Sequence, residues 1–451
     1  MSLDLTYTLP VQFRRALTLF DATMLVIGGI IGSGIFINPY IVAGRLDSSW
    51  QVLTAWAIGG AVAMAGAFAY AELGRLLPRA GGQYVYLREA WHPLLGFLYG
   101  WALLFIIQTG AMAAVAITFA EYTLRLTGNS AASARVLAIA AIVVLSAVNY
   151  VGVKPGSRVL NVFVVLKVLA LAMLIVFAWF QPAAPGWLSD VRTDDSPSGL
   201  LTMGVALIPI MFAYGGWQQT NYVAEEIKDP ERQLPRALIF GTLAVVAIYL
   251  LANVAYLRTL GLEGLAGTKT PAADTAGRWL GANGERFVGT AIAISTFGFL
   301  NLAVLAASRV YYAMAVDGAF LPALARLHPR FQTPTTSIVL QSSIAVIWTL
   351  SGEYGALLDS VVFADWIFFG LTVAGLFVLR PRYGDRPGYR TPGYPWLPAL
   401  FVMVSIVVVA SAVHDAPGRQ AIGAGLLLLG VPVYYAFTSR ARPRAQGPRP
   451  K

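Results

Sequence analysis

The 451-residue sequence is 57% hydrophobic and only 12% charged, with a mean hydropathy of +0.66. Soluble globular proteins average about 25% charged residues, so this composition excludes a water-soluble domain. The absence of cysteine excludes disulfides, a thiolate nucleophile and a cysteine-ligated metal. The net charge of +10 does not indicate nucleic-acid binding, because the cations lie in loops between apolar runs and no nucleic-acid or nucleotide-binding motif is present.

Twelve apolar segments are long enough to cross a bilayer. Continuous runs of this length predict helices, because barrel strands alternate apolar and polar residues. No signal peptide is expected. The sequence therefore predicts an all-α polytopic membrane protein with twelve transmembrane helices. The expected spans cover residues 19–44, 51–77, 94–124, 133–150, 157–180, 198–225, 236–258, 286–316, 336–352, 356–379, 396–413 and 420–438.

The distribution of Lys and Arg predicts the orientation of these spans. With the N-terminus in the cytoplasm, 22 of the 32 cations face the cytoplasm and nine face the other side, while Lys167 lies within a span. The positive-inside rule then places both termini, residues 1–18 and the basic tail 439–451, on the cytoplasmic side of the inner (plasma) membrane. The tail could also contact anionic membrane lipids, but an orientation signal explains its charge better.

Two spans contain helix-breaking residues at their centres. The first span has four glycines within seven positions, residues 28–34, and the sixth has Pro209 followed by Gly215 and Gly216. Paired interruptions at matching positions of two five-helix halves point to a transporter site at the membrane midplane. Close helix packing is the alternative explanation, and it accounts for either segment alone better than for the pair.

Unwound backbone at these two places could bind an α-amino acid without any charged side chain. Amides at the start of the outer half-helix would donate to the carboxylate, favoured by the helix dipole, and nearby carbonyls would accept from the ammonium. The residues predicted to bind substrate are Ile30, Ile31, Gly32, Ser33, Gly34, Ile35, Phe212, Ala213, Tyr214 and Gly215.

Several motifs resemble one family of transporters. Gly-Ser-Gly-Ile-Phe at 32–36 resembles the first-helix signature of the amino acid, polyamine and organocation (APC) superfamily, and residues 70–84 resemble its second helix and following loop. Segments 212–237, 248–256 and 295–309 resemble the L-type amino acid transporter branch. The resemblance implies a LeuT-type fold, with inverted five-helix repeats at 19–180 and 198–379 and two extra helices at 394–438. It also implies alternating-access transport of amino acids without a cofactor.

The resemblance assigns roles to single residues as well. Phe212 matches an aromatic that closes over bound substrate, and Tyr249 matches a seventh-helix tyrosine near the site. Lys154 matches a fifth-helix lysine that links the first and eighth helices, so neutralising it should slow or uncouple transport; an orientation charge is the alternative. The other predicted gate or pocket residues are Trp217, Gln218 and Asn301. The departures from the family pattern are Gly29, Gln108, Gln218 and Gln219, and they leave side-chain selectivity open.

The substrate prediction depends on the acidic residues. Because no carboxylate is expected beside the first-helix break, neutral L-amino acids are favoured over cationic amino acids or polyamines, and exchange or proton-linked uptake over sodium coupling. Glu121 and Asp365 could change this if they approached the pocket. Asp365 lies inside the tenth span, where a charge costs roughly 3 kcal/mol. Glu225 and Glu226 are expected to pair with loop arginines.

A channel, an amino acid sensor and a membrane enzyme are the alternatives to a carrier. A channel or an amino acid sensor could use the same broken helices, and trans-stimulated uptake distinguishes a carrier from a pore. A membrane enzyme would need convergent catalytic groups, which three scattered histidines do not supply. Members of the branch in eukaryotes often bind a heavy subunit through a disulfide, and a chain without cysteine cannot do so.

Overall fold

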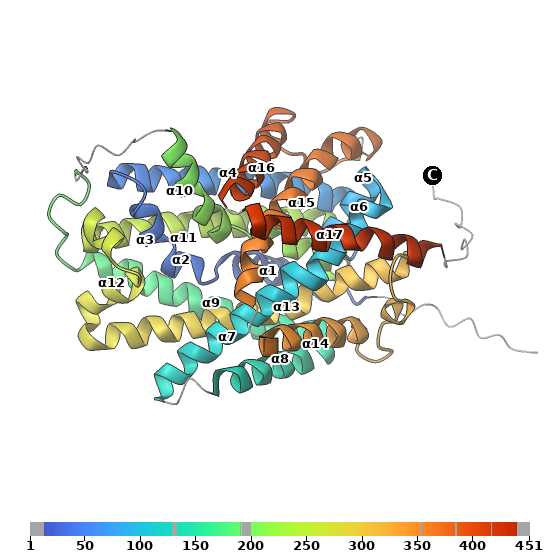
Figure 1. Cartoon of the computed structure of the whole chain (residues 1–451), viewed down its shortest axis with the longest axis horizontal. Helices are drawn as coiled ribbons and strands as arrows, with labels where there is room; N and C mark the ends of the chain where they lie inside the picture. Colours follow the sequence, from blue (N-terminus) through green and yellow to red (C-terminus); the bar gives the residue numbers. More distant parts are fainter. Residues whose placement is uncertain are drawn as a thin grey trace, which may run out of the picture.

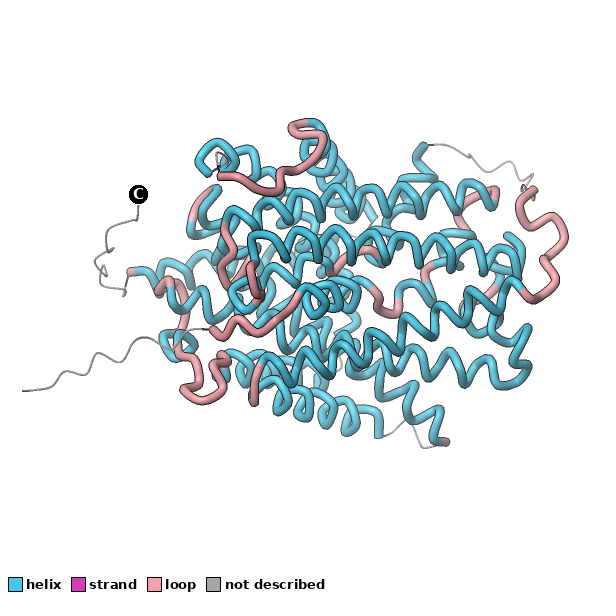
Figure 2. Tube along the Cα trace, turned by 180° about the vertical axis from the view of Figure 1, so that it is seen from behind, coloured by secondary structure: helices cyan, strands magenta, loops and turns pink. Residues whose placement is uncertain are grey.

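The computed structural model describes residues 13–128, 133–189, 191, 200–351, 354–383, 386–415 and 417–439. In these ranges the chain forms helices and loops, with two isolated β-bridges and no extended strand (Figure 2). Most of the long helices run along the long axis of the molecule (Figure 1). The predicted all-α fold is therefore confirmed.

The first half of the chain begins with three short helices, α1 to α3, in the region of the first expected span. Its elements are α1 (Leu19–Ile30), α2 (Gly34–Ile37), α3 (Pro39–Ala43), α4 (Ser49–Leu76), α5 (Gln83–Ala90), α6 (Pro93–Ala102), a π-helical turn η1 (Leu103–Ile107), α7 (Gln108–Thr127), α8 (Ala134–Tyr150) and α9 (Val153–Trp179).

The second half of the chain is helical as well. Its elements are α10 (Leu200–Ala213), a 3-10 helix η3 (Trp217–Glu226), α11 (Pro230–Gly267), α12 (Pro271–Leu280), η4 (Gly281–Asn283), α13 (Gly284–Val316), η5 (Pro322–Ala325), α14 (Thr335–Ser351) and α15 (Tyr354–Tyr383). Two more helices, α16 (Trp396–Asp415) and α17 (Pro417–Thr438), pack against α15.

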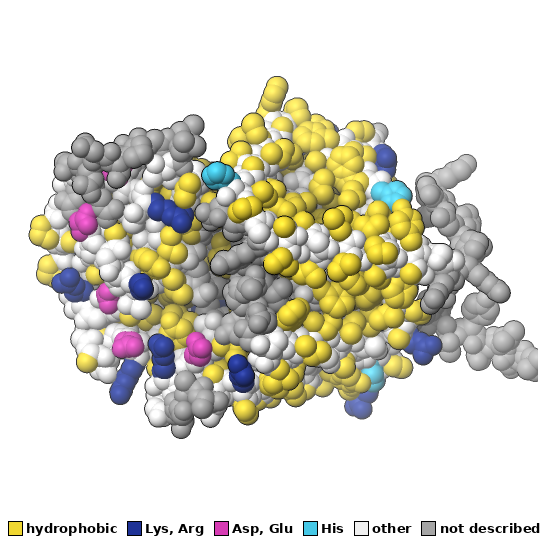
Figure 3. Space-filling model, viewed as in Figure 1, with side chains coloured by type: hydrophobic (Ala, Val, Ile, Leu, Met, Phe, Trp, Pro, Cys, Tyr) yellow, Lys and Arg dark blue, Asp and Glu magenta, His cyan; other side chains and the backbone are white. Residues whose placement is uncertain are grey.

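The helices have the length and composition of membrane spans. Within the described ranges, eight helical segments are long and apolar enough to cross a bilayer, and α1, α8 and α14 are shorter apolar helices. Hydrophobic side chains cover a wide area of the surface around α17, and the charged side chains visible in this view lie mostly toward the two ends of the molecule (Figure 3). The protein is thus a multi-pass membrane protein.

The loops that follow α4, α13 and α15 lie together at one end of the bundle, because Arg75 donates to the carbonyl of Arg386 at 3.1 Å, Arg382 donates to that of Glu89 at 2.9 Å, and Arg88 pairs with Asp317. We call this end the Arg-rich side. The described arginines of these loops and of the adjoining helix ends include Arg79, Arg88, Arg326, Arg330 and Arg382.

Helix α1 begins on the Arg-rich side with a capping box. The hydroxyl of Thr18 accepts a hydrogen bond from the Asp21 amide at 3.3 Å, and the Asp21 carboxylate accepts one from the Thr18 amide at 2.8 Å. Lys154 and Asn161 of α9 donate to the same carboxylate at 2.7 and 2.8 Å. A cap of this kind satisfies backbone groups that the helix itself leaves free, so it fixes where the first span begins.

The segment before α1 is joined to the end of η3 on the Arg-rich side. The amides of Ala16 and Leu17 donate to the carbonyl of Glu226 at 2.9 and 2.8 Å, and the amide of Lys228 donates to the carbonyl of Leu17 at 2.9 Å. The Glu226 carboxylate is buried and pairs with Arg309 of α13 at 2.6 Å. We call these interactions the Leu17–Glu226 ladder; they hold the start of the first span against the end of the sixth.

Candidate functional site

The first span is interrupted at its glycine-rich centre. Helix α1 ends at Ile30 and α2 begins at Gly34, so residues 31–33 lie outside the helices. Ile31 has φ −73° and ψ 95°, an extended conformation that turns the chain out of the helix. The turn leaves carbonyls at the end of α1 and amides at the start of α2 without partners inside a helix.

Side chains of neighbouring helices bind several of these carbonyls. The ammonium of Lys167, fully buried in α9, donates to the carbonyls of Gly28 and Ile31 at 3.0 and 2.5 Å. The hydroxyl of Ser295 in α13 also donates to the Ile31 carbonyl, at 3.2 Å. A carbonyl oxygen has two lone pairs, so Ile31 has no acceptor position left for a ligand. Lys167 thus joins α9 to the end of α1.

The amides on the other side of the break stay free. Those of Ser33, Gly34 and Ile35 find no acceptor in the part of the chain that the structure describes. A side chain at Gly32 would meet nothing within 4 Å, which shows that the backbone faces open space there. Unpaired amides beside a cavity are ready to bind an anionic group.

The sixth span is interrupted at the same depth. Helix α10 ends at Ala213 and η3 begins at Trp217, with Gly216 at φ +107°, a left-handed conformation that favours glycine. The backbones of the two breaks touch: a Cβ atom on Gly216 would lie 2.1 Å from the carbonyl oxygen of Gly29, and one on Gly29 would lie 2.5 Å from that of Gly216. Only glycine allows this contact at either position.

Tyr249 of α11 connects the two breaks. Its buried hydroxyl lies 3.0 Å from the carbonyl oxygen of Ile30 and 3.3 Å from that of Ala213. One hydroxyl has one proton to donate, so at least one lone pair on each carbonyl remains available. Both carbonyls belong to residues that line the cavity described next.

A cavity of about 150 Å³ opens between the breaks. It is lined mainly by apolar side chains, with a few polar ones, from α1, α2, η1, α7, α10, η3, α13 and α15. The lining residues are Gly29, Ile30, Gly32, Ser33, Gly34, Leu103, Ile107, Gln108, Ala111, Val115, Met211, Phe212, Ala213, Gly215, Gly216, Gln218, Gln219, Thr296, Phe299, Asp365, Trp366 and Phe369.

The structure brings eight of the predicted site residues into this lining. They are Ile30, Gly32, Ser33, Gly34, Phe212, Ala213, Gly215 and Gln218. Phe212 is 46% exposed, an arrangement that leaves its ring free to move. Gln218 accepts the amide proton of Gly216 at 3.0 Å and so supports the second break as well as the lining.

Six other predicted residues lie behind the lining rather than in it. They are Ile31, Ile35, Tyr214, Trp217, Tyr249 and Asn301.

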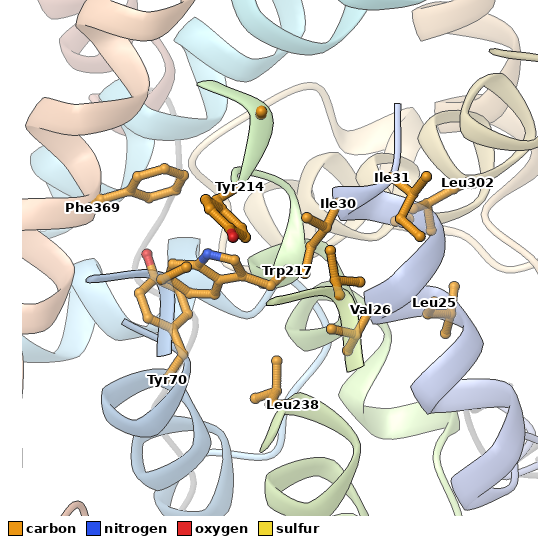
Figure 4. Close-up of a cluster of buried hydrophobic side chains, with 14 of the residues drawn as sticks. Leu25, Val26, Ile30, Ile31, Tyr70, Tyr214, Trp217, Leu238, Leu302 and Phe369 are labelled. Atoms are coloured by element: carbon orange, nitrogen blue, oxygen red, sulfur yellow. The ribbon is translucent and has the colours of Figure 1, made fainter. Parts of the chain in front are cut away.

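Three of these six residues are held by contacts outside the cavity. Tyr214 and Trp217 are buried beside Tyr70 and Phe369 (Figure 4), and the rings of Trp217 and Tyr70 meet edge to face at 4.7 Å. Asn301 donates to the carbonyl of Gly156 at 2.8 Å, which is a contact between helices. These residues support the site without forming its wall.

The two lysines of α9 have different surroundings. Lys154 lies at the Arg-rich end of α9, is 39% exposed and pairs with Asp21 at 2.7 Å, so it is not at the break. Lys167, which the sequence analysis only placed within a span, is the lysine that contacts the break, and its neighbour there is Ser295 of the eighth span. In the described chain, Lys167 therefore joins α9 to the end of α1, and Ser295 joins α13 to the same carbonyl.

Sequence reasoning missed much of the far wall, which comes from η1, α7, α13 and α15. Asp365 lines the cavity, so the expectation of a pocket without an acidic group is wrong. Gln108 was noted only as a departure from a family pattern; it follows the π-helical turn η1, and such turns are frequent at functional sites. Glu121 is exposed near the far end of α7 and is not part of the lining.

The described residues contain no group of three His, Asp or Glu side chains that could hold a metal ion. The site is instead a pair of discontinuous helices around a small cavity, inside a bundle of apolar helices. These features define a multi-pass membrane protein with a candidate binding site at its centre.

Comparison with known proteins gives the family. The model of the amino acid permease family matches residues 17–437. The chain is 33% identical to the serine/threonine exchanger SteT of Bacillus subtilis, over 95% of this chain and 98% of that protein. It is 32% identical to the cystine/glutamate transporter of Homo sapiens (95% and 86%) and 31% identical to the b(0,+)-type amino acid transporter 1 of Homo sapiens (94% and 88%).

The chain belongs to the amino acid permease family, in the branch that resembles L-type transporters, and it is an amino acid transporter rather than an enzyme. Because it has no cysteine, it cannot form a disulfide with a heavy subunit.

Proposed function

We propose that the protein exchanges L-amino acids, neutral ones among them, across the membrane by alternating access. The observation that carries this proposal is the set of free amides at Ser33, Gly34 and Ile35, which belong to the segment bordering a cavity and have no acceptor in the described chain. A substrate carboxylate would accept from these amides, and its ammonium would donate to the carbonyls of Ile30 and Ala213.

Contacts between helices support two inverted five-helix repeats with two added helices, twelve spans in all. The first, second, third and fourth spans of one half contact their counterparts in the other, in the pairs α1 with η3, α4 with α11, α7 with α13 and α8 with α14. The proposed repeats are 19–180 and 198–379, and α16 and α17 are the added helices. With the positive-inside rule, the Arg-rich side and both termini face the cytoplasm.

Lys167 supports exchange over sodium-linked uptake. Its ammonium already occupies the carbonyls at the end of α1, where a cation could otherwise bind. The serine/threonine exchanger among the relatives has exchange in its name, which agrees with this mode. Proton-linked uptake is the second candidate, because a lysine desolvated in a membrane interior can release its proton.

The test uses purified protein in liposomes. Vesicles preloaded with an unlabelled amino acid should take up a labelled one faster than empty vesicles, and an imposed pH gradient should add little. Uptake that follows the pH gradient and ignores the internal amino acid would replace exchange by proton-linked uptake. Absence of trans-stimulation under all conditions would remove the carrier and leave a channel or a sensor.

A further inference from the structure

Asp365 of α15 is the acidic side chain of the cavity wall. Among the described residues that line the cavity, it is the one with an acidic or basic side chain. It is half-buried and lies in the tenth span, where an unpaired carboxylate is costly unless a cation or water reaches it.

No group in the described chain neutralises this carboxylate. Asp365 forms no ion pair or hydrogen bond with any of the described residues. Two cations of the bundle interior are engaged elsewhere: Lys167 binds carbonyls of α1, and Arg309 binds Glu226. The wall therefore presents a carboxylate that accepts a partner from the cavity.

We propose that Asp365 binds the cationic end of the substrate side chain. The transporter then accepts amino acids with a side-chain ammonium or guanidinium group and prefers them to neutral amino acids of the same shape. The proposal rests on the proposed function, because the same cavity must hold the amino acid head group at the two breaks.

The layout of the cavity fits such a substrate. The free amides lie at the start of α2 and Asp365 lies on α15, so the head group and the side-chain cation have separate partners. Apolar residues of η1 and α7, among them Leu103 and Ile107, line the same cavity and suit an aliphatic stem. In a water-poor site, the ion pair offsets the cost of removing both charges from water.

A role confined to the protein scaffold would need a partner for the carboxylate, and its neighbours do not provide one. The hydroxyls of Tyr99 and Tyr222 are hydrogen-bonded to each other, and neither these two hydroxyls nor that of Tyr70 forms a hydrogen bond with Asp365. Trp366, the next residue, stacks on Phe401 with 5.8 Å between the ring centroids, so its ring is engaged in that contact and not with the carboxylate. A scaffold role predicts that Asp365→Asn weakens lysine and norleucine equally in the experiment below.

The experiment compares lysine with norleucine, which shares the first four side-chain carbons and lacks the ammonium. Counterflow in liposomes measures how strongly each competes with a labelled amino acid, in the wild type, Asp365→Asn and Glu121→Gln. In the wild type lysine should compete at least about tenfold better than norleucine, and Asp365→Asn should reduce that ratio at least about tenfold. Glu121→Gln, the same change outside the cavity, should keep the wild-type ratio.

If Asp365→Asn does not transport, binding is measured instead, as the rise in melting temperature that each amino acid causes in detergent. Lysine should then raise the melting temperature of the wild type more than norleucine does, and the difference should vanish in Asp365→Asn. The proposal is overturned if the wild type exchanges amino acids yet does not favour lysine, or if Asp365→Asn weakens lysine and norleucine equally. Failure of all amino acids to exchange in the wild type would instead overturn the proposed function.

Discussion

The two breaks of the transporter leave different parts of the backbone free. At the first break, side chains from α9 and α13 bind the carbonyl of Ile31, while the amides of Ser33 and Gly34 stay open. At the second break, the amides of Tyr214, Gly215 and Gly216 are already bonded within the segment. The first break is thus suited to bind an anionic group, and the second mainly supplies packing and one carbonyl.

The largest expected effect comes from removing the glycine at which the two breaks touch. Gly216→Ala forces a side chain into a left-handed backbone position and against the carbonyl of Gly29, which should cost about 3 kcal/mol or more of unfolding free energy. The melting temperature in detergent measures this cost. Gly204→Ala in α10, where a Cβ would meet nothing within 4 Å, is the control; equal melting of both variants would contradict a tight contact.

The next largest effect is a difference in exchange rate between substitutions of the two lysines of α9. Lys167→Ala leaves the carbonyls of Gly28 and Ile31 without their buried donor, so exchange should fall at least about tenfold. Lys154→Ala removes one half-exposed ion pair, while Asp21 keeps its bonds to Thr18 and Asn161, so exchange should change less than about threefold. A larger loss in Lys154→Ala would restore the assignment that the sequence favoured.

A smaller effect concerns the predicted gate. Phe212→Ala should slow exchange several-fold and leave the melting temperature almost unchanged, because the ring is 46% exposed and contributes little packing. Counterflow rates and melting curves are measured on the same preparations. Phe240→Ala, which removes another exposed ring from α11, is the control, and equal slowing in both variants would argue against a gate.

The smallest effect is expected at the hydroxyl that connects the breaks. Tyr249→Phe removes a hydrogen bond shared by the carbonyls of Ile30 and Ala213, and it should cost about 1 kcal/mol of unfolding free energy. Chemical denaturation in detergent measures the loss. If the variant is as stable as the wild type, the hydroxyl does not hold the two breaks together.

The location of the breaks could be predicted from the sequence, because Gly28, Gly29, Gly32 and Gly34 gather in one apolar run and glycine weakens a helix wherever it stands. The direction of each side chain could not. Ile31 begins the break and Ile35 follows it closely, yet both side chains are fully buried, since the course of an unwound segment depends on the helices around it.

Contacts between distant segments explain the other errors. Lys154 and Lys167 are 13 residues apart, about 20 Å along a helix, so a motif match at one end of α9 could not show which lysine meets the break. Asp365 was visible as a carboxylate in a span, but its place in the cavity wall follows from how α15 packs beside α7. Such tertiary contacts leave no trace in the periodicity of a single helix.

The Leu17–Glu226 ladder has a consequence for the route of release. Its bonds run from backbone to backbone and lie beside the buried charge pair of Glu226 and Arg309. In the proposed alternating-access cycle, these bonds would have to break together for the site to open on this side, because packed interfaces change between discrete arrangements. Side-chain changes at Ala16 and Leu17 would leave its hydrogen bonds in place.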